Sequence, residues 1–288
     1  AHVPVLIDQE GGRVARLRGP HWLEWPRLVD TLERLSPNAA AEAIALRFRL
    51  IAGELADLGI DVDCMPMLDV PRAESHDIVT DRIIGRDPAE ITRMGVLIAD
   101  ALRDGGVLSV IKHIPGHGRA TVDSHLGLPR VDAPLDALIE TDFQPFRDLR
   151  HELMAMTAHI VFDALDPLAP ATLSAPAVSA IRGIIGFDGL LMTDDISMGA
   201  LTGPVERDAG QALAAGCDMV LHCNGDMGEM RALAEVVPAL SGRALQRAEA
   251  VEAARPAPAP FDRAAALRQY RALTGFDPVS GGQTERAD

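Results

Sequence analysis

Short apolar segments alternate with helical patterns along most of this chain, and this alternation constrains the fold more than any other feature. Six segments are too short for helices and lie beside turn residues, which predicts strands. They are residues 3–7, 60–68, 107–111, 153–157, 189–192 and 219–221. Strands separated by helices of this length predict an α/β fold with a parallel sheet, either open or closed into a barrel.

Two of the intervening helices have clear start and stop signals. Ser36 is a typical N-cap residue and is followed by Pro37, and the apolar spacing continues until Gly59. Asp87 begins the second helix, which we expect to end at Gly105.

Polar residues follow nearly every predicted strand. They are Asp8, Asp69, Lys112 with His113, His159, Asp194 and Asn224. A (β/α)8 barrel gathers its active site at the carboxyl ends of all its strands, whereas a doubly wound sheet concentrates it at one switch point. Residues 10–13 also lack the G-x-G-x-x-G spacing of a dinucleotide site. We therefore expect a TIM (β/α)8-type barrel.

Six strands are two fewer than this barrel requires. The chain starts at Ala1 and enters a strand within three residues, so the simplest expectation is a barrel that lacks its first two βα units. Unrecognised strands are the alternative. We expect residues 1–252 to form a single, N-terminally incomplete barrel domain. Residues 253–275 are predicted to be a Pro/Ala-rich connector and a terminal helix that packs on the barrel, and residues 276–288 a disordered tail.

Composition excludes several classes of protein. The 288 residues are 48% hydrophobic, which is enough to bury a full core, and the formal charge of −15 repels nucleic acid and anionic membranes. Cys64, Cys217 and Cys223 have neither zinc nor disulfide-framework spacing. Because the sequence contains no signal sequence and no long apolar stretch, we expect a cytoplasmic protein that binds no membrane. We also expect a monomer that binds no nucleic acid, no metal and no cofactor.

One residue stands out in the composition. Lys112 is the only lysine among the 27 basic residues, and it lies in the segment KHIPGHG. Retention of one lysine where arginine is used everywhere else indicates a site that needs a compact ammonium group.

Four segments carry a family resemblance: residues 7–17, 112–129, 156–174 and 186–201. Together they resemble the bacterial β-N-acetylhexosaminidases of glycoside hydrolase family 3, the cytoplasmic type that works in peptidoglycan recycling. The resemblance runs from Ala1 to about Leu273. It implies a single TIM barrel with about two more βα units before the first segment. It also implies a retaining exo-β-N-acetylglucosaminidase whose substrates are muropeptides with a terminal β-linked N-acetylglucosamine.

A retaining glycosidase uses a carboxylate nucleophile together with an acid/base group. The resemblance implies that Asp194 is the nucleophile. Asp195 is its rival, but adjacent side chains of a strand point in opposite directions, so only one can face the sugar. The implied acid/base is His125, oriented by Asp123, and an imidazole suits this role because it titrates near neutral pH.

Six further side chains are implied to bind substrate: Asp8, Arg16, Arg82, Lys112, His113 and His159. The sequence around Arg82 departs from the family pattern, which leaves Arg86 as an alternative. His159 has a core histidine as its alternative.

Three other interpretations remain open at this stage. His113, His117 and His125 suggest a metal cluster together with Asp123, but Pro115-Gly116 prevents the helix that would bring the first two together. A histidine acid/base also suits a glycoside phosphorylase, because a neutral imidazole repels phosphate less than a carboxylate does. The third interpretation is an inactive truncated fragment, because an incomplete barrel leaves unpaired strand edges.

Overall fold

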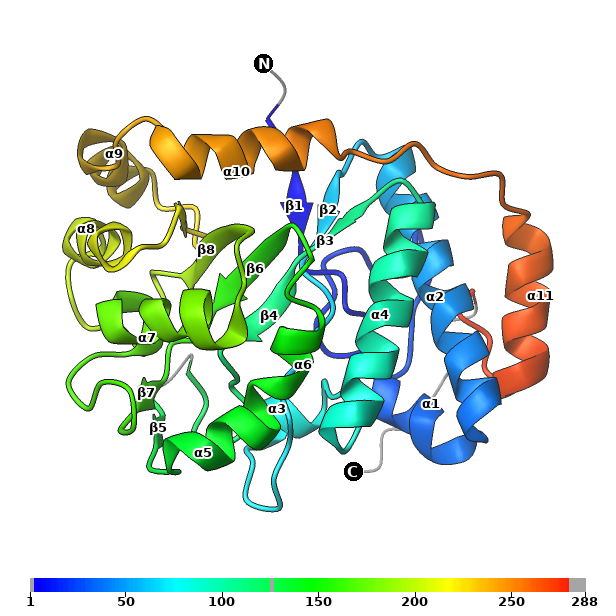
Figure 1. The fold of residues 1–288 in the computed structure, drawn as a ribbon. Helices are drawn as coiled ribbons and strands as arrows, with labels where there is room; N and C mark the ends of the chain where they lie inside the picture. The colour runs from blue at the N-terminus through cyan, green and yellow to red at the C-terminus, as the bar shows by residue number, and fades with distance from the viewer. Residues whose placement is uncertain (1–2, 125–126, 280–288) are drawn as a thin grey trace.

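The computed structural model describes residues 3–124 and 127–279. Its main strands are all parallel and follow each other in chain order (Figure 1). β1 (Leu6–Ile7) pairs with β2 (Val62–Asp63), and β2 with β3 (Leu108–Ser109). β4 (Ile111–Ile114) continues the segment of β3 and pairs with β6 (Met154–Thr157), which is followed by β8 (Leu190–Asp195) and β9 (Met219–Leu221). In the described residues these strands occupy six positions, which confirms the six predicted strands.

Some strands are shorter than the sequence suggests. Residues 60–68 contribute the strand Val62–Asp63 and, after Pro66, a single bridge between Met67 and Lys112, because Pro66 has no backbone N–H to donate. The structure also contains a pair that the sequence did not predict, in which β5 (Arg130–Val131) runs parallel to β7 (Val161–Phe162). Two residues are too few to produce a recognisable alternation of side chains.

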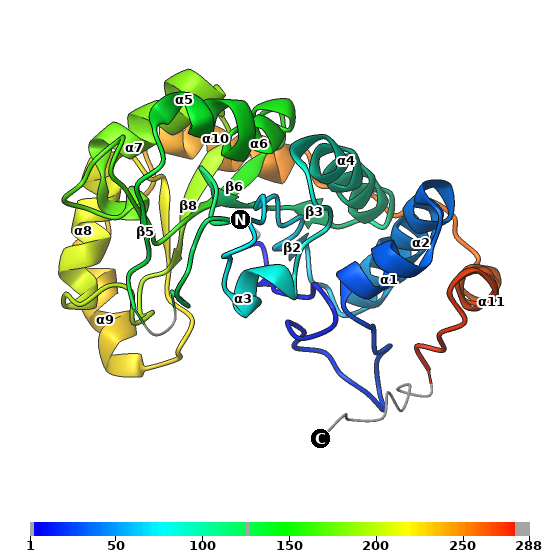
Figure 2. The ribbon, with the colours of Figure 1, turned by 90° about the horizontal axis from the view of Figure 1, so that it is seen from below.

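The helices are α1 (Leu28–Arg34), α2 (Pro37–Asp57), α3 (Asp77–Thr80), α4 (Pro88–Asp104), α5 (Leu135–Ala137), α6 (Gln144–Asp148), α7 (Ala175–Ala180), α8 (Val205–Ala215), α9 (Met227–Val236), α10 (Gly242–Ala253) and α11 (Arg263–Thr274). Most of them line the convex side of the sheet, as Figure 2 shows from below, whereas α3 lies within the arc and α10 crosses the amino ends of the strands. Ser36 Oγ accepts a hydrogen bond from Ala39 N, and Asp87 Oδ1 accepts one from Glu90 N. Both predicted N-caps are therefore confirmed.

The strands bury both of their faces. Ala155 and Leu191 belong to the large core between the sheet and the helices, whereas Met154 and Leu190 belong to a second core inside the curve. This alternation is expected for a strand with apolar surroundings on both sides. Val251 of α10 joins the inner core, and Figure 1 shows α10 lying across the amino ends of the strands.

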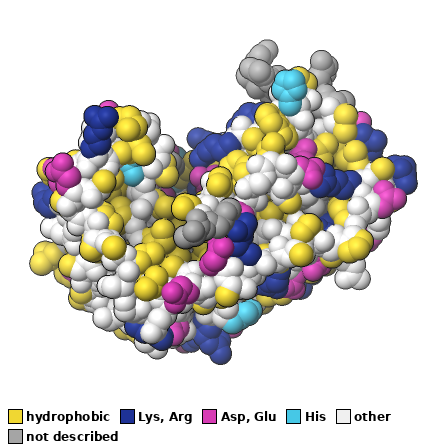
Figure 3. Space-filling model, turned by 90° about the horizontal axis from the view of Figure 1, so that it is seen from above, with side chains coloured by type: hydrophobic (Ala, Val, Ile, Leu, Met, Phe, Trp, Pro, Cys, Tyr) yellow, Lys and Arg dark blue, Asp and Glu magenta, His cyan; other side chains and the backbone are white. Residues whose placement is uncertain are grey.

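The arc of strands is open between β1 and β9. Residues 3–124 and 127–279 contain no pairing between these two strands, and Figure 2 shows the opening. A cavity of about 390 Å³ lies there, with Leu6, Cys64, Met156 and Leu221 in its walls. Figure 3 shows, from the opposite side, hydrophobic side chains gathered in the hollow. The fold is thus a TIM-barrel-like α/β arrangement with two free strand edges.

After α10 the chain crosses to α11, which packs on α2. Arg263 of α11 forms an ion pair with Asp57 and donates a hydrogen bond to the carbonyl of Gly53. In the part of the chain that the structure describes, no helix is both long enough and apolar enough to cross a bilayer.

Candidate active site

A cavity of about 210 Å³ lies at the carboxyl ends of the strands. Its walls come from strands β4, β6 and β8 and from the segments after β1, β2, β4 and β8. They are Asp8, Arg13, Val14, Arg16, Ile78, Arg82, Lys112, His113, His117, Ser124, Met156, Asp194 and Met198. Of the candidate residues, the structure brings together Asp8, Arg16, Arg82, Lys112, His113 and Asp194 in this space. We call it the glycan cavity, after the sugar ligand that the family resemblance of the sequence implies.

Asp194 and Asp195 have different surroundings. Asp194 lies in the wall of the glycan cavity, where its Oδ1 accepts a hydrogen bond of 2.8 Å from the N–H of Asp195. The carboxylate of Asp195 instead accepts hydrogen bonds from the N–H and hydroxyl of Ser197 and from the N–H of Cys223. The Asp195 carboxylate therefore fixes the turn after β8, and Asp194 is the carboxylate available to a ligand.

The surroundings of Asp194 favour its ionised form. Burial opposes its negative charge, but His113, His159 and the N–H of Asp195 outweigh burial and hold the pKa of Asp194 below its usual value. The Nε2 atom of His113 lies 3.9 Å from Asp194 Oδ2. A nucleophilic carboxylate must carry its charge at working pH, and this environment provides for that.

Glu10 is the centre of a buried charge network that the sequence did not reveal. Its Oε1 lies 2.6 Å from Lys112 Nζ, and both of its oxygens accept hydrogen bonds from Arg82, at 2.7 and 3.0 Å. Burial opposes ionisation of Glu10, but Arg82 and Lys112 outweigh burial and lower its pKa. Burial likewise opposes the charge of Lys112, while Asp8 and Glu10 outweigh burial and raise its pKa. Each charge in the network has a close partner of opposite sign.

The two candidate arginines, Arg82 and Arg86, differ in their contacts with this network. Arg82 packs against Glu10 with 12% of its side chain exposed and lies in the wall of the cavity, whereas Arg86 is exposed and forms an ion pair with Glu33. The position of Arg82 thus suits the implied role and that of Arg86 does not.

A second carboxylate holds His113 in place. Asp69 Oδ2 lies 2.7 Å from His113 Nδ1, and Asp69 Oδ1 accepts hydrogen bonds from the N–H groups of His113 and His117. Burial opposes the charge of Asp69, but His113 outweighs burial and lowers the pKa of Asp69. Because the ionised carboxylate can only accept, Nδ1 carries the proton and Nε2 faces Asp194.

Lys112 and His113 are adjacent, yet both line the cavity. The pairing of β4 with β6 shifts its register between Lys112 and Ile114. Such an irregularity redirects side chains that would otherwise alternate between the two faces of the sheet.

The loop after β1 is fixed by a glutamine. Gln9 Oε1 accepts hydrogen bonds from the N–H groups of Arg16 and Leu17, and Gln9 Nε2 donates to the carbonyl of Leu17. The N–H of Gln9 donates in turn to the buried carboxyl of Asp63. Arg16 can therefore reach Asp8, whose Oδ2 lies 3.0 Å from Arg16 Nη2.

His159 differs from the other candidates because it does not line the glycan cavity, and its role in sugar binding stays a prediction. Its Nδ1 lies 2.7 Å from Thr172 Oγ1, and its Nε2 lies 2.9 Å from the carbonyl oxygen of Asp195. The ring is buried, and both nitrogens already have partners in the protein. We assign His159 to supporting the backbone beside Asp194.

His117 is buried in the cavity wall, and its Nε2 makes no hydrogen bond with the described part of the chain. Burial lowers the pKa of His117 to about 4, so the ring is neutral. His125 lies outside the described residues. Asp123 and Ser124 precede it, and the carbonyl of Ser124 accepts a hydrogen bond from Ala200, in the segment after β8. Among the residues described, no group of three or more His, Cys, Asp or Glu side chains is placed to hold a metal ion.

The sequence contained partial signals for the two buried carboxylates. Asp69 follows a predicted strand, as the other polar residues of the site do. Glu10 is two positions after Asp8, the spacing that returns an extended chain to the same face. Neither signal identifies the cations that these carboxylates hold.

The comparisons with known proteins agree with this geometry. Residues 1–255 match the glycosyl hydrolase family 3 N terminal domain. The β-hexosaminidase of Alkalilimnicola ehrlichii is 39% identical over 226 residues, which are 76% of this chain and 64% of that protein. The β-hexosaminidase of Idiomarina loihiensis is 33% identical over 248 residues, 84% of this chain and 74% of that protein. The match to the first of these relatives thus spans less than two thirds of its length.

Solved structures show the same fold. NagZ from Neisseria gonorrhoeae, in complex with N-trifluoroacetyl-D-glucosamine, superposes with a TM-score of 0.80 at 29% identity and covers 95% of this chain and 82% of its own. A glycoside hydrolase family 3 β-N-acetylglucosaminidase from a Paenibacillus species gives a TM-score of 0.79 at 28% identity, with 95% of this chain and 56% of its own covered. The candidate site lies at the strand ends and contains a buried charge network, and the family model matches most of the chain. The protein therefore belongs to glycosyl hydrolase family 3.

Proposed function

We propose that this site hydrolyses terminal β-linked N-acetylglucosamine from peptidoglycan-derived muropeptides in the cytoplasm, with retention of configuration. The observation that carries the proposal is the environment of Asp194. Its carboxylate is ionised in the wall of the cavity, while the neighbouring Asp195 is occupied with the turn. Asp194 is the nucleophile, His125 the acid/base and Asp123 the residue that orients His125.

The reaction has two steps. In the first, Asp194 attacks the anomeric carbon, the bond from that carbon to the leaving oxygen breaks, and His125 donates a proton to that oxygen. In the second, His125 takes a proton from water, whose oxygen attacks the same carbon and displaces Asp194. Two inversions retain the configuration, and both residues return to their starting states.

The charge network provides the contacts to the sugar. Lys112 and Arg82 are held by Glu10, and Arg16 is held by Asp8 and by the loop. Because their positions are fixed before a ligand arrives, little conformational freedom is lost when their N–H groups donate to hydroxyl and carbonyl oxygens.

The relatives support the choice of sugar. Two of them are named β-hexosaminidases, and the Neisseria gonorrhoeae structure holds an N-acylated glucosamine. The muropeptide aglycone and the cytoplasmic location follow from the family resemblance of the sequence.

A matched pair of chromogenic substrates tests the proposal. The full chain is incubated with an aryl N-acetyl-β-glucosaminide and with the β-glucoside that has the same leaving group. We expect the N-acetylated substrate to be turned over at least about tenfold faster, and equal or faster turnover of the glucoside contradicts the proposal. Free sugar formed in phosphate buffer supports hydrolysis, whereas a sugar 1-phosphate indicates a phosphorylase. A cooperative thermal transition in the same sample excludes an inactive, unfolded fragment.

A further inference from the structure

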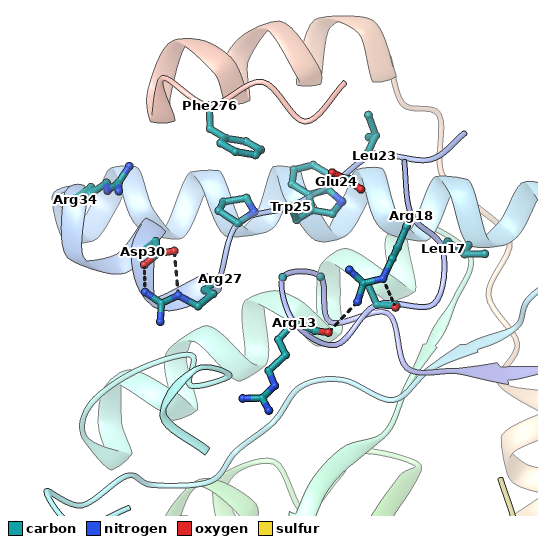
Figure 4. A pocket seen from close by; sticks show the side chains of 14 residues that line it. Arg13, Leu17, Arg18, Leu23, Glu24, Trp25, Arg27, Asp30, Arg34 and Phe276 are labelled. Carbon is teal, nitrogen blue, oxygen red and sulfur yellow. Dashed lines mark hydrogen bonds and ion pairs between the residues drawn. The ribbon is translucent and has the colours of Figure 1, made fainter. Parts of the chain in front are cut away.

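A second cavity lies behind the loop that carries Arg16. Its volume is about 530 Å³, more than twice that of the glycan cavity. Figure 4 shows its side chains, which come from the loop after β1, from α1 and from the segment after α11. We call it the arginine pocket because Arg13, Arg18, Arg27 and Arg34 all line it.

One loop separates the two cavities. Val14 and Arg16 line the glycan cavity, whereas Ala15 and Leu17 line the arginine pocket. This alternation is that of an extended segment with a cavity on each side. Arg13 lines both spaces, so a ligand that extends over the loop from the glycan cavity meets Arg13 first.

Two arginines of the pocket already have acidic partners. Arg27 forms ion pairs with Asp30 at 2.9 Å and with Asp81 at 2.7 Å. Arg13 is 3.4 Å from the same Asp81. The other acidic group of the lining, Glu24, accepts a hydrogen bond from the N–H of Gly19.

The charges of the other two arginines have no such compensation. Arg18 donates hydrogen bonds to the carbonyls of Ala15 and Arg13, at 3.1 and 3.0 Å. These neutral acceptors orient the guanidinium group without cancelling its charge. Arg34 lies in the last turn of α1, and its guanidinium forms neither a hydrogen bond nor an ion pair with the residues described. In a chain with a net charge of −15, such a group of cations indicates an anionic ligand.

We infer that the arginine pocket binds a carboxylate-bearing part of the aglycone while the terminal sugar occupies the glycan cavity. This inference rests on the proposed function and adds a preference for acidic aglycones. A guanidinium group presents two parallel N–H donors to a carboxylate, which gives both energy and orientation. Leu23 and Phe276 supply apolar walls for the uncharged remainder of such a group.

The test compares two disaccharides that differ in one carboxylate. One is N-acetylglucosamine linked β-1,4 to N-acetylmuramic acid, and the other is N,N′-diacetylchitobiose, which lacks the lactyl group. Binding is measured by calorimetry in the full-length Asp194→Asn variant, so that neither ligand is consumed. The pocket is altered by Arg34→Gln alone and by Arg18→Gln with Arg34→Gln. Arg93→Gln, at an exposed position of α4, is the matched control.

We expect the acidic disaccharide to bind roughly 5- to 20-fold more tightly at about 0.02 M salt, with a smaller advantage at about 0.5 M. The double variant should lose this advantage, Arg34→Gln should lose part of it, and Arg93→Gln should keep it. Three results would each overturn the inference. They are equal affinities for the two disaccharides before the pocket is changed, tighter binding of the acidic disaccharide that survives in the double variant, and no binding of either disaccharide. Hydrolysis of the chromogenic substrate decides the proposed function separately.

Discussion

The two sides of the loop after β1 use the same type of residue in opposite ways. Beside the glycan cavity the network of Glu10, Lys112 and Arg82 is largely buried and matched: the exposed fractions of the side chains are 3% for Glu10, 2% for Lys112 and 12% for Arg82. Around the arginine pocket Arg27 is about half exposed, at 48%, and so is Arg13, at 50%, which lines both cavities. Arg82 thus belongs to a rigid network, whereas Arg27 lies on an adaptable surface.

The difference follows from the cost of removing charge from water. A buried charge is tolerated only when every partner is present, so a change to one partner affects the whole set. Exposed pairs remain solvated and contribute little to stability. Substitutions on the glycan side should therefore have large effects on activity and stability, and substitutions in the arginine pocket should change only affinity.

The largest effect is expected at Asp194. Asp194→Asn should reduce turnover of all substrates by roughly 10⁴-fold or more, because no covalent intermediate can form without the carboxylate. Asp195→Asn is the matched control and should stay within about tenfold of the parent, because its carboxylate supports the turn. Steady-state rates with one aryl substrate decide the matter, and the reverse ranking would move the nucleophile to Asp195.

The next effect concerns His125. His125→Ala should slow substrates with poor leaving groups on the order of 10²–10⁴-fold and activated aryl substrates much less, because a good leaving group departs without a proton. Azide should restore the second step by attacking the intermediate, and Asp123→Ala should give a milder form of the same pattern. Uniform loss across leaving groups, without rescue by azide, would leave His125 only a binding role.

A direct test of the contrast between the two sides compares Glu10→Gln with Asp30→Asn. Glu10→Gln leaves Lys112 and Arg82 buried without their shared carboxylate, and removal of one member of a buried pair costs about 3–5 kcal/mol. Asp30→Asn removes one of the two partners of Arg27 at the surface and should cost less than about 1 kcal/mol. Urea unfolding at pH 7 measures both values, and similar costs would mean that the two regions do not differ as described.

The smallest expected effect is a pH dependence of the free energy of unfolding, which comes from a carboxyl group beneath the site. Burial raises the pKa of Asp63 to about 7, above its ordinary value of 3.8. Below about pH 4 this carboxyl is protonated in both the folded and the unfolded state. Between about pH 4 and 7 the unfolded chain loses the proton first, so the free energy of unfolding falls as pH rises.

Asp63→Asn removes this titration while keeping an oxygen that can accept from Gln9. The variant should gain stability relative to the parent between pH 5 and pH 8, by roughly 2–4 kcal/mol at most. Urea unfolding at the two pH values gives the difference. A constant difference between the two proteins would contradict the raised pKa.

Local signals predicted much of the fold and part of the site. Ser36 and Asp87 cap the helices that the sequence predicted, and Asp8, Lys112 and Asp194 meet because the carboxyl ends of parallel strands share one edge. These features depend on neighbours in the chain or on the sheet as a whole.

What the sequence could not predict depends on contacts between distant segments. Glu10 and Arg82 are 72 positions apart, so nothing near either residue indicates that they pair. The same limitation applies to the choice between Arg82 and Arg86, four positions apart on the chain, of which one is buried and one exposed. His159 belongs to this group as well, because its two partners, Thr172 and Asp195, lie in separate segments of the chain.

The most direct measurement concerns the covalent intermediate at Asp194. The full chain is incubated with a 5-fluoro N-acetylglucosaminyl fluoride, whose leaving group departs readily while the ring fluorine slows hydrolysis of the intermediate. Mass spectrometry of the denatured protein and its peptides should show one added sugar on the segment Leu190–Asp195, and no addition in Asp194→Asn. An adduct elsewhere, or turnover without any adduct, would contradict the assignment of Asp194 as the nucleophile.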